Sequence, residues 1–248
     1  MIISFVHTKG GTGKTTLSHC LAYSKTFAKE FDSIALVELD AQGSLRDWHA
    51  ERMKYFGEAE GNNSKTTYEE LFADNFIDSP VGMKNGILKL LKKYDLLILD
   101  VPGESRSKFA SRFAAALSDI TFIPSRTSDK DENSFNSHVR PMVEEIIASQ
   151  TNKENSFRII PTMVSPNSNV QNIVDYFDLI KPDSLPTLST LSAVLCSRGL
   201  FEQYSRSGFT LEEYSASVKR NKRDFEAASN AISDIEGIAK AILKAVKG

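Results

Sequence analysis

A glycine- and lysine-rich stretch near the start of the chain has the composition and spacing of a phosphate-binding loop. It reads His7-Thr8-Lys9-Gly10-Gly11-Thr12-Gly13-Lys14-Thr15-Thr16. Its glycines let successive backbone N–H groups converge on one point, where an anion can bind. Lys14 is placed to reach the β- and γ-phosphates of a nucleotide, and the Thr15 hydroxyl is placed to ligate Mg²⁺. The residues that we expect to contact the nucleotide are Lys9, Gly10, Gly11, Thr12, Gly13, Lys14, Thr15 and Thr16.

Two aspartates follow apolar stretches further along the chain. Asp40 follows Ile34–Leu39, and Asp100 follows Leu96–Leu99. Carboxylates that leave the carboxyl ends of parallel strands, beside a phosphate loop, lie where doubly wound sheets bind ligands. Asp100 is placed to hold Mg²⁺ through its water shell, because hard cations prefer oxygen ligands. Asp40 is a second candidate for the metal site, and its alternative role is that of a strand-end cap or turn residue.

These residues require a particular order of elements. Ile2 to Val6 is a run of apolar and β-branched residues that is typical of a buried parallel strand. The apolar spacing from Thr15 to about Lys29 predicts a helix. A strand, a glycine loop and a helix in this order are what a phosphate-binding loop requires.

The remaining segments complete the predicted fold. We expect strands at Ile120–Pro124 and Phe157–Val164 and a helix at Val139–Ile147. The middle of the chain is less regular: the expected elements are an exposed loop at Glu58–Thr67, short helices at Tyr68–Phe76 and Gly86–Lys93, and a charged, polar segment at Asp129–Asn133.

Composition limits the class of protein. Hydrophobic residues make up 41% and charged residues 25% of the chain, as in soluble globular proteins. No apolar run approaches the roughly 20 residues that span a bilayer. Because the first predicted strand begins at Ile2, we expect no removable signal peptide. Cys20 and Cys196 have neither metal-type spacing nor a disulfide framework, as in a cytosolic protein with reduced thiols. With a net charge of −2, any nucleic-acid binding requires a local basic patch.

The second lysine of the loop points to a family. The string Lys9-Gly10-Gly11-Thr12-Gly13-Lys14-Thr15 matches the form KGGxGK[ST] and resembles the ParA/MinD family of dimeric P-loop ATPases, with His7 at the first glycine position of the common loop. The resemblance implies one doubly wound α/β domain over residues 1–248, with a mostly parallel sheet and helices on both faces. It also implies that Lys9 reaches across a dimer interface to the ATP of the other subunit, where a cation offsets phosphate charge. The implied catalytic residues are Lys9, Lys14 and Asp40.

The resemblance extends to Asp40. The first switch of the family has the pattern DxDPQ, and Asp40 matches its second aspartate, which in relatives orients the attacking water. This chain departs from the pattern at Glu38, in place of the first aspartate, and at Ala41, in place of the proline. We expect the longer Glu38 side chain still to reach a metal-bound water.

Asp100 begins a segment that resembles the second switch of the family. In that segment Gly103 is free to move and sense the γ-phosphate. The basic residues that follow, between Arg106 and Arg112, form either a solvated helix face or contacts to a dimer partner or DNA. Relatives bind adenine at the end of the strand that corresponds to Phe157–Val164, so Thr162 and Met163 are the candidates here.

The last third of the chain carries weaker signals. Arg198-x-x-Phe201 followed by Ser207-Gly208 resembles the family's arginine, aromatic and glycine near the final helix, or is a plain helix that ends at a glycine. The basic run of Lys219, Arg220, Lys222 and Arg223 is either a solvated surface or a contact to the phosphate backbone of non-specific DNA.

The final helix of the chain has an apolar face. Ile235, Ile238, Ala239, Ile242 and Val246 fall on that face at helical spacing. Such a helix either covers the sheet or lies in a membrane surface, as the C-terminal segment of MinD does.

The resemblance implies a slow, Mg²⁺-dependent ATPase of the small, ParF-like partition class, because a first strand at Ile2 leaves no room for an N-terminal helix-turn-helix. Such a protein is a homodimer with ATP, binds non-specific DNA in that state and is released with ADP. A centromere-binding or cargo adaptor protein stimulates hydrolysis. The implied location is cytoplasmic and nucleoid-associated. Two alternatives stay open: a membrane-associated positioning ATPase and a metabolic enzyme on the same fold, such as a ligase or a nitrogenase-type iron protein.

Overall fold

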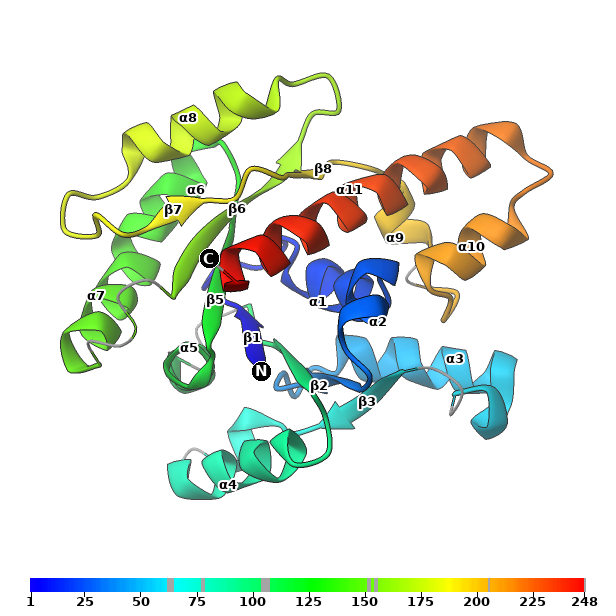
Figure 1. Cartoon of the computed structure of the whole chain (residues 1–248), viewed down its shortest axis with the longest axis horizontal. Coiled ribbons are helices and arrows are strands. Elements are labelled where there is room, and N and C mark those ends of the chain that lie inside the picture. Colours follow the sequence, from blue (N-terminus) through cyan, green and yellow to red (C-terminus); the bar gives the residue numbers. More distant parts are fainter. Residues whose placement is uncertain are drawn as a thin grey trace.

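The sheet at the centre of the molecule has the strand order β3-β2-β4-β1-β5-β6-β7, with β8 paired to β6. The computed structural model describes residues 1–61, 65–76, 79–103, 108–150, 153, 156–204 and 206–247. Neighbouring strands in this part of the chain run parallel, and helices cover both faces of the sheet (Figure 1). The predicted fold, a doubly wound α/β domain with a mostly parallel sheet, is confirmed.

The elements have the following bounds. The strands are β1 (Ile2–Phe5), β2 (Ile34–Glu38), β3 (Thr66–Glu70), β4 (Leu96–Asp100), β5 (Ile120–Ser125), β6 (Phe157–Val164), β7 (Ser189–Thr190) and β8 (Leu195–Cys196). The helices are α1 (Lys14–Ala22), α2 (Lys25–Glu30), α3 (Ser44–Gly61), α4 (Pro80–Leu91), α5 (Lys108–Leu117), α6 (Asp129–Ser134), α7 (Arg140–Ser149), α8 (Val170–Ile180), α9 (Leu200–Tyr204), α10 (Leu211–Ser217) and α11 (Lys222–Lys247). A 3₁₀ turn spans Ala73–Phe76, and a π-helical turn at Phe135–Val139 joins α6 to α7.

Side chains of the central strands alternate between two hydrophobic cores. Ile3 and Phe5 of β1 face the core that contains α1, α2 and α11, whereas Ile2 faces the core that contains α4, α5 and α7. The β4 residues Leu96–Leu99 alternate in the same way. Because both faces of the sheet are buried, its central strands are apolar throughout, which is why continuous apolar runs predicted them.

The strand order places the ends of three strands side by side. In the parallel register, Asp100 at the end of β4 is paired with Phe5 of β1 and with Glu38 of β2. The connections that follow these strands therefore leave the same edge of the sheet. This edge is where a doubly wound sheet binds its ligands, and the glycine loop, Asp40 and Asp100 all lie there.

The first predicted helix is two helices. The segment from Thr15 to Lys29 is divided into α1 and α2 after Ala22. The Ser24 hydroxyl accepts a hydrogen bond from the Phe27 N–H at 3.2 Å, so Ser24 caps the start of α2. The continuous helix that the apolar spacing predicted is therefore interrupted, because Ser24 starts a second helix.

The predictions for residues 58–76 were wrong at several points. Helix α3 extends to Gly61, and Thr66–Glu70 is the edge strand β3 rather than part of a loop and of the predicted helix Tyr68–Phe76; residues 62–64 lie outside the described residues. Pairing with β2, in the register Ile34 to Thr66, holds this polar segment in the sheet. Threonine and tyrosine favour such a half-buried strand, but the pairing itself is a tertiary contact.

Two further boundaries differ from the prediction. Helix α4 begins at Pro80, ahead of the predicted start at Gly86, with proline in the first turn, where its missing N–H costs nothing. The polar segment Asp129–Asn133 lies within helix α6, whose first turn is capped by the Ser128 hydroxyl. The helix predicted at Val139–Ile147 corresponds to α7.

Helix α11 packs against the sheet face that α1 and α2 also cover (Figure 1). Ile235, Ile238 and Ile242 are at most 2% exposed, whereas Val246 is 37% exposed. The apolar face of the helix is therefore covered by the protein, as the first of the two alternatives predicted. None of the helices in the described part of the chain has the length and apolar character to cross a membrane.

The contrast between Ile238 and Val246 gives a test of this packing. Ile238→Ala should lower the free energy of unfolding by about 2–5 kcal/mol, because it leaves a cavity in a fully buried core. Val246→Ala on the same helix should change it by less than about 0.5 kcal/mol. Urea unfolding followed by circular dichroism measures both, and equal effects would contradict the buried position of Ile238.

Candidate functional site

A cavity of about 560 Å³ opens beside the loop between β1 and α1. Gly11 and Gly13 in this loop have φ angles of 69° and 95°, which glycine adopts readily and other residues rarely do. Gly13 directly precedes α1, so the unpaired N–H groups of the first helical turn are available to an anion. The described lining residues are Gly10, Gly11, Gly13, Lys14, Thr15, Thr16, Asp40, Ala41, Gln42, Val101, Pro102, Gly103 and Met163. The volume is in the range of pockets for small molecules and cofactors.

Most of the loop residues predicted to contact a nucleotide line this cavity, and two do not. Lys9 and Thr12 are not among its described lining residues. Thr12 is fully buried, and its hydroxyl has no hydrogen-bond partner in the described part of the chain. Gln42, Val101 and Pro102 line the cavity although the sequence analysis did not single out their side chains.

Lys14 lies between the loop and the segment that follows β4. Its ammonium group donates a hydrogen bond to the Lys9 carbonyl at 3.1 Å, and the side chain is only 5% exposed. Burial lowers the pKa of Lys14, whereas the nearby Asp100 and Asp40 raise it. A Cβ atom at Gly103 would lie 3.1 Å from the Lys14 ammonium nitrogen, so this close approach favours glycine there.

Asp100 is tied to the first two turns of α1. Its carboxylate accepts hydrogen bonds from the Thr15 hydroxyl at 2.9 Å and the Ser18 hydroxyl at 3.2 Å. Burial raises the pKa of Asp100 to about 7, although the Thr15 hydrogen bond and the Lys14 charge lower it. Asp100 therefore contacts the cavity through Thr15, which lines it directly.

The hydroxyl and carboxylate oxygens at this edge fit Mg²⁺. Thr15 and Asp40 line the cavity, and Asp100 hydrogen bonds to Thr15. In the described residues there is no group of three or more His, Cys, Asp or Glu side chains that could hold a metal. A cation would therefore need oxygens from phosphate and water as well, which is how Mg²⁺ is usually held.

Asp40 begins the turn between β2 and α3. One of its carboxylate oxygens accepts a hydrogen bond from the Gln42 N–H at 2.9 Å, and the Gly43 N–H donates to the Asp40 carbonyl. The turn role that the sequence left open is therefore real. The same residue also lines the cavity, so its carboxylate is available to a ligand there.

Glu38 makes structural contacts that the sequence analysis did not predict, and its contact with a metal-bound water stays a prediction. Its fully buried carboxylate accepts hydrogen bonds from the Leu45 N–H at 3.1 Å, the Arg46 N–H at 2.9 Å and the Tyr68 hydroxyl at 2.7 Å. Burial raises the pKa of Glu38, and these three hydrogen bonds lower it. Glu38 thus caps the start of α3 and ties it to β3.

Lys9 forms an ion pair within its own subunit. Its ammonium nitrogen lies 2.6 Å from a carboxylate oxygen of Asp131, a side chain that is 2% exposed. Burial raises the pKa of Asp131, but hydrogen bonds from Lys9 and Ser128 outweigh it, so the pKa lies below its usual range. The sequence analysis gave Lys9 a partner only across a dimer interface and did not find Asp131, which lies far along the chain.

The two adenine candidates differ in accessibility. Thr162 is 1% exposed, lies next to Gly13 and is not among the described residues that line the cavity, and its contact with adenine stays a prediction. Met163 is 38% exposed, has a φ angle of 54°, and lines the cavity. A positive φ at a residue other than glycine costs energy and is common at binding sites.

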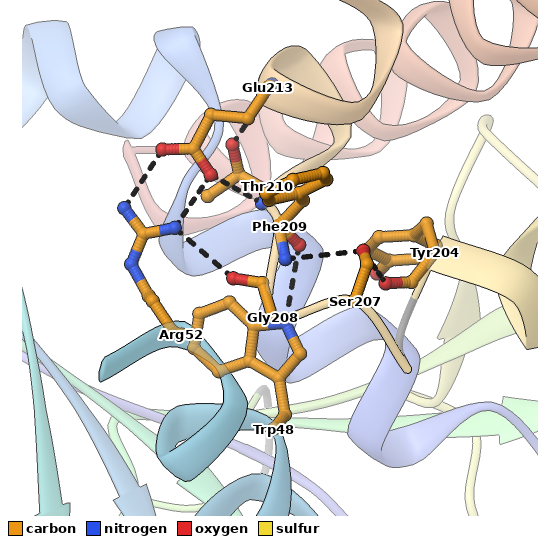
Figure 2. A network of polar contacts seen from close by, with 8 residues as sticks. All are labelled: Trp48, Arg52, Tyr204, Ser207, Gly208, Phe209, Thr210 and Glu213. Atoms are coloured by element: carbon orange, nitrogen blue, oxygen red, sulfur yellow. Dashed lines mark hydrogen bonds and ion pairs between the residues drawn. The ribbon is translucent and has the colours of Figure 1, made fainter. Parts of the chain in front are cut away.

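A polar network fastens α3 to the C-terminal part of the chain, and Figure 2 shows it. The Arg52 guanidinium donates two hydrogen bonds to the Glu213 carboxylate, at 2.6 and 2.8 Å, and one to the Gly208 carbonyl at 3.3 Å. The Trp48 indole N–H donates to the Phe209 carbonyl at 3.2 Å. Because α3 begins directly after the turn at Asp40, the network fixes one wall of the site to the segment before α10.

The remaining family-like residues of the C-terminal part have structural roles. Arg198 forms an ion pair with Asp234 of α11, with a nitrogen–oxygen distance of 2.7 Å. Gly208 has a φ angle of 70°, and a Cβ atom there would lie 2.4 Å from the Arg52 backbone nitrogen. Phe201 packs against the core that contains α11.

The predicted DNA-binding residues lie together at the connection between α10 and α11 (Figure 1). Lys219, Arg220, Lys222 and Arg223 are all exposed. They do not occur among the described residues that line the cavity. Of the basic residues between 106 and 112, Arg106 lies outside the described residues, and Arg112 pairs with Glu145.

The chain is similar in sequence to one protein family and in fold to several solved structures. Residues 3–197 match the family described as the CobQ/CobB/MinD/ParA nucleotide binding domain. No curated protein sequence matches the chain. Three solved structures are similar in fold. A putative plasmid partition protein from Borrelia burgdorferi bound to AMPPNP has 18% sequence identity and a TM-score of 0.64, covering 98% of each chain.

The other two structures are McdA and MinD. The McdA–ATP complex from Cyanothece has 17% identity and a TM-score of 0.60, covering 95% of this chain and 96% of that one. MinD from Aquifex aeolicus has 15% identity and a TM-score of 0.62, covering 98% of this chain and 97% of that one. At these identities the likeness concerns the fold.

His19, whose ring packs against Trp48 and Tyr204, gives a pH prediction. It is 4% exposed, its Nδ1 lies 3.0 Å from the Tyr204 hydroxyl, and burial, with the charge of Arg52, lowers its pKa to about 3. In the unfolded chain the pKa is about 6.5. Between these values the unfolded state binds more protons, so stability is present above about pH 6.5 and is lost as the pH falls.

We expect His19→Gln to flatten this dependence. Lowering the pH from 7.5 to 5.5 should reduce the free energy of unfolding of the wild type by about 1.4 kcal/mol through His19 alone, because His19 stays neutral in the folded state. Urea unfolding at both pH values should therefore show a smaller loss for the variant than for the wild type. His138→Gln, at an exposed histidine of the π-helical turn, is the control and should behave as the wild type does.

Proposed function

The chain belongs to the CobQ/CobB/MinD/ParA nucleotide-binding domain family, and from this premise we propose that it is a Mg²⁺-dependent ATPase of the ParA type. In this proposal it dimerises with ATP, binds non-specific DNA as a dimer, and is released as ADP forms. A cargo-bound adaptor stimulates hydrolysis, and the cargo is a plasmid or another large assembly. The family is one of nucleotide-binding partition and positioning ATPases, and the McdA and Borrelia structures contain ATP and AMPPNP.

One observation carries the proposal: the residues for each part of ATP hydrolysis surround one cavity. The glycine loop and Lys14 lie at one side, Asp40 at another, and Gly103 at a third. Phosphoryl transfer depends on positioning and on charge stabilisation rather than on covalent chemistry. The wall of the cavity combines N–H donors, a buried lysine and a carboxylate, which are the groups that positioning and charge stabilisation require.

Each residue of the wall has a distinct task in this proposal. The loop N–H groups and Lys14 bind the β- and γ-phosphates. The Thr15 hydroxyl, oriented by Asp100, offers an oxygen to Mg²⁺, which supplies charge neutralisation when bound. Asp40 orients the attacking water. Gly103 lies close enough to Lys14 to respond to the γ-phosphate.

Lys9 is the residue that we propose acts across the dimer. In the single subunit it is held by Asp131 rather than directed into its own cavity. When two subunits meet around two ATP molecules, the phosphates of the partner offer more negative charge than one carboxylate does. Lys9 then exchanges Asp131 for the nucleotide of the other subunit, which makes dimerisation depend on ATP.

The membrane alternative has less support in the structure. Its anchor would be the apolar face of α11, and Ile235, Ile238 and Ile242 on that face are buried against the sheet. The basic run Lys219–Arg223 is exposed at the start of the same helix. It offers the positive charge that non-specific binding to a phosphate backbone requires.

Three substitutions should separate the steps. Lys14→Ala should abolish binding of a fluorescent ATP analogue. Asp40→Ala should keep the ATP-bound dimer but stall phosphate release, because the water is no longer oriented. Lys9→Ala should retain some binding in the monomer and lose the ATP-dependent dimer in light scattering. Lys54→Ala, at an exposed lysine of α3, is the control. Hydrolysis at the wild-type rate in Asp40→Ala would refute its role.

Sedimentation with non-specific duplex DNA or with anionic liposomes, each with ATP and with ADP, tests the function as a whole. We expect ATP-dependent DNA binding that weakens as salt rises. The double variant Arg220→Ala/Arg223→Ala should bind DNA more weakly, whereas Lys240→Ala/Lys244→Ala, with the same loss of charge near the other end of α11, should not. Liposome binding without DNA binding would favour the membrane-associated alternative, and binding to neither would exclude both.

A further inference from the structure

Arg126 contacts the glycine loop and is not among the described residues that line the cavity. It directly follows β5, the strand that is paired with β1, so it leaves the sheet beside the loop. One terminal guanidinium nitrogen of Arg126 donates a hydrogen bond to the Gly11 carbonyl. The Arg126 Nε is buried and has no hydrogen-bond partner in the described part of the chain. The structure thus holds an arginine against a backbone carbonyl of the loop, at a position that the proposed mechanism does not use.

The direction of the Gly11 carbonyl matters for binding of an anion. In a trans peptide the C=O and the following N–H point in opposite directions. Because Arg126 holds the Gly11 carbonyl, the Thr12 N–H points away from Arg126, between Gly11 and Gly13, which both line the cavity. Gly11 has a φ angle of 69° and lacks a side chain to fix it, so this peptide would otherwise rotate readily.

The same short segment also holds Lys9. The Ser128 N–H donates a hydrogen bond to the Arg126 carbonyl at 3.0 Å, and the Ser128 hydroxyl donates one to Asp131 at 2.6 Å. Asp131 in turn pairs with Lys9. Arg126, directly after β5, and Asp131, in the first turn of α6, therefore hold the loop at two points: Arg126 contacts the Gly11 carbonyl, and Asp131 pairs with Lys9.

We propose that Arg126 is a positioning residue of the nucleotide site, which orients the Gly11–Thr12 peptide for binding of a nucleoside di- or triphosphate. The inference rests on the proposed function. It concerns the β-phosphate in particular, because converging backbone N–H groups form the site for an anion. Unlike Lys9, Arg126 acts within its own subunit, so its effect is expected in the monomer and with ADP.

The test is the affinity of the full chain for fluorescently labelled ADP and for AMP. Arg126→Gln should weaken ADP binding about tenfold or more, as expected when a hydrogen bond from a charged group is lost. It should change AMP binding little, because AMP lacks the β-phosphate. Arg126→Lys keeps the charge but not the planar fork, and its affinity for ADP should lie between those of the wild type and Arg126→Gln.

The controls separate this effect from bulk charge and from misfolding. Arg140→Gln removes a cation that pairs with Glu144 on α7 and should leave ADP affinity unchanged. The inference would be overturned if Arg140→Gln lost as much ADP affinity as Arg126→Gln does. It would also be overturned if Arg126→Gln kept wild-type ADP affinity, or if it lost affinity for ADP and AMP equally. If Arg126→Gln does not fold, Arg126→Lys decides, and wild-type ADP affinity there would overturn it. A wild-type chain that binds neither ADP nor ATP would instead refute the proposed function.

Discussion

The hydrogen bond from Thr15 to Asp100 is the contact on which the site depends. It joins the first turn of α1 to the end of β4 at 2.9 Å, and the Ser18 hydroxyl adds a second contact one turn further along. A carboxylate that is 1% exposed is costly unless such donors satisfy it. The donors to Asp100 are in α1, so the glycine loop that precedes α1 must lie beside the end of β4. The parallel pairing of β1 with β4 places it there.

The glycine loop has two kinds of contact. At the cavity, Lys14 and the N–H groups of the first helical turn form a positive wall for an anion. The loop is also held by Arg126, directly after β5, and by Asp131 of α6, neither of which is among the described residues that line the cavity. Lys9 is held by a single carboxylate, and in the proposed dimer the phosphates of the second nucleotide replace that carboxylate. In this proposal the loop stays ordered in the monomer and still releases one cation to the partner.

The wall that carries Asp40 is connected to the far end of the chain. Glu38 caps the start of α3, and Arg52 joins α3 to Glu213 at the start of α10. Gly208 fits against the Arg52 backbone, where a side chain would collide. Movement of the turn at Asp40 would therefore strain contacts that reach the segment before the exposed basic run. These contacts give the nucleotide site and the proposed DNA surface a shared structural element.

The sequence by itself determined the features that local chemistry dictates. Positive φ angles require glycines in the loop, and strands buried on both faces require apolar runs, so the loop, Ile2–Val6 and Leu96–Asp100 could be predicted from residue types alone. Only the tertiary structure decided what Glu38, Lys9 and Thr162 contact: Glu38 caps α3, Lys9 pairs with Asp131, and Thr162 lies beneath Gly13. The same holds for β3, whose polar residues became a strand by pairing with β2. Apart from the cap that Glu38 provides to the nearby start of α3, these outcomes depend on groups brought together from distant parts of the chain, which residue spacing does not encode.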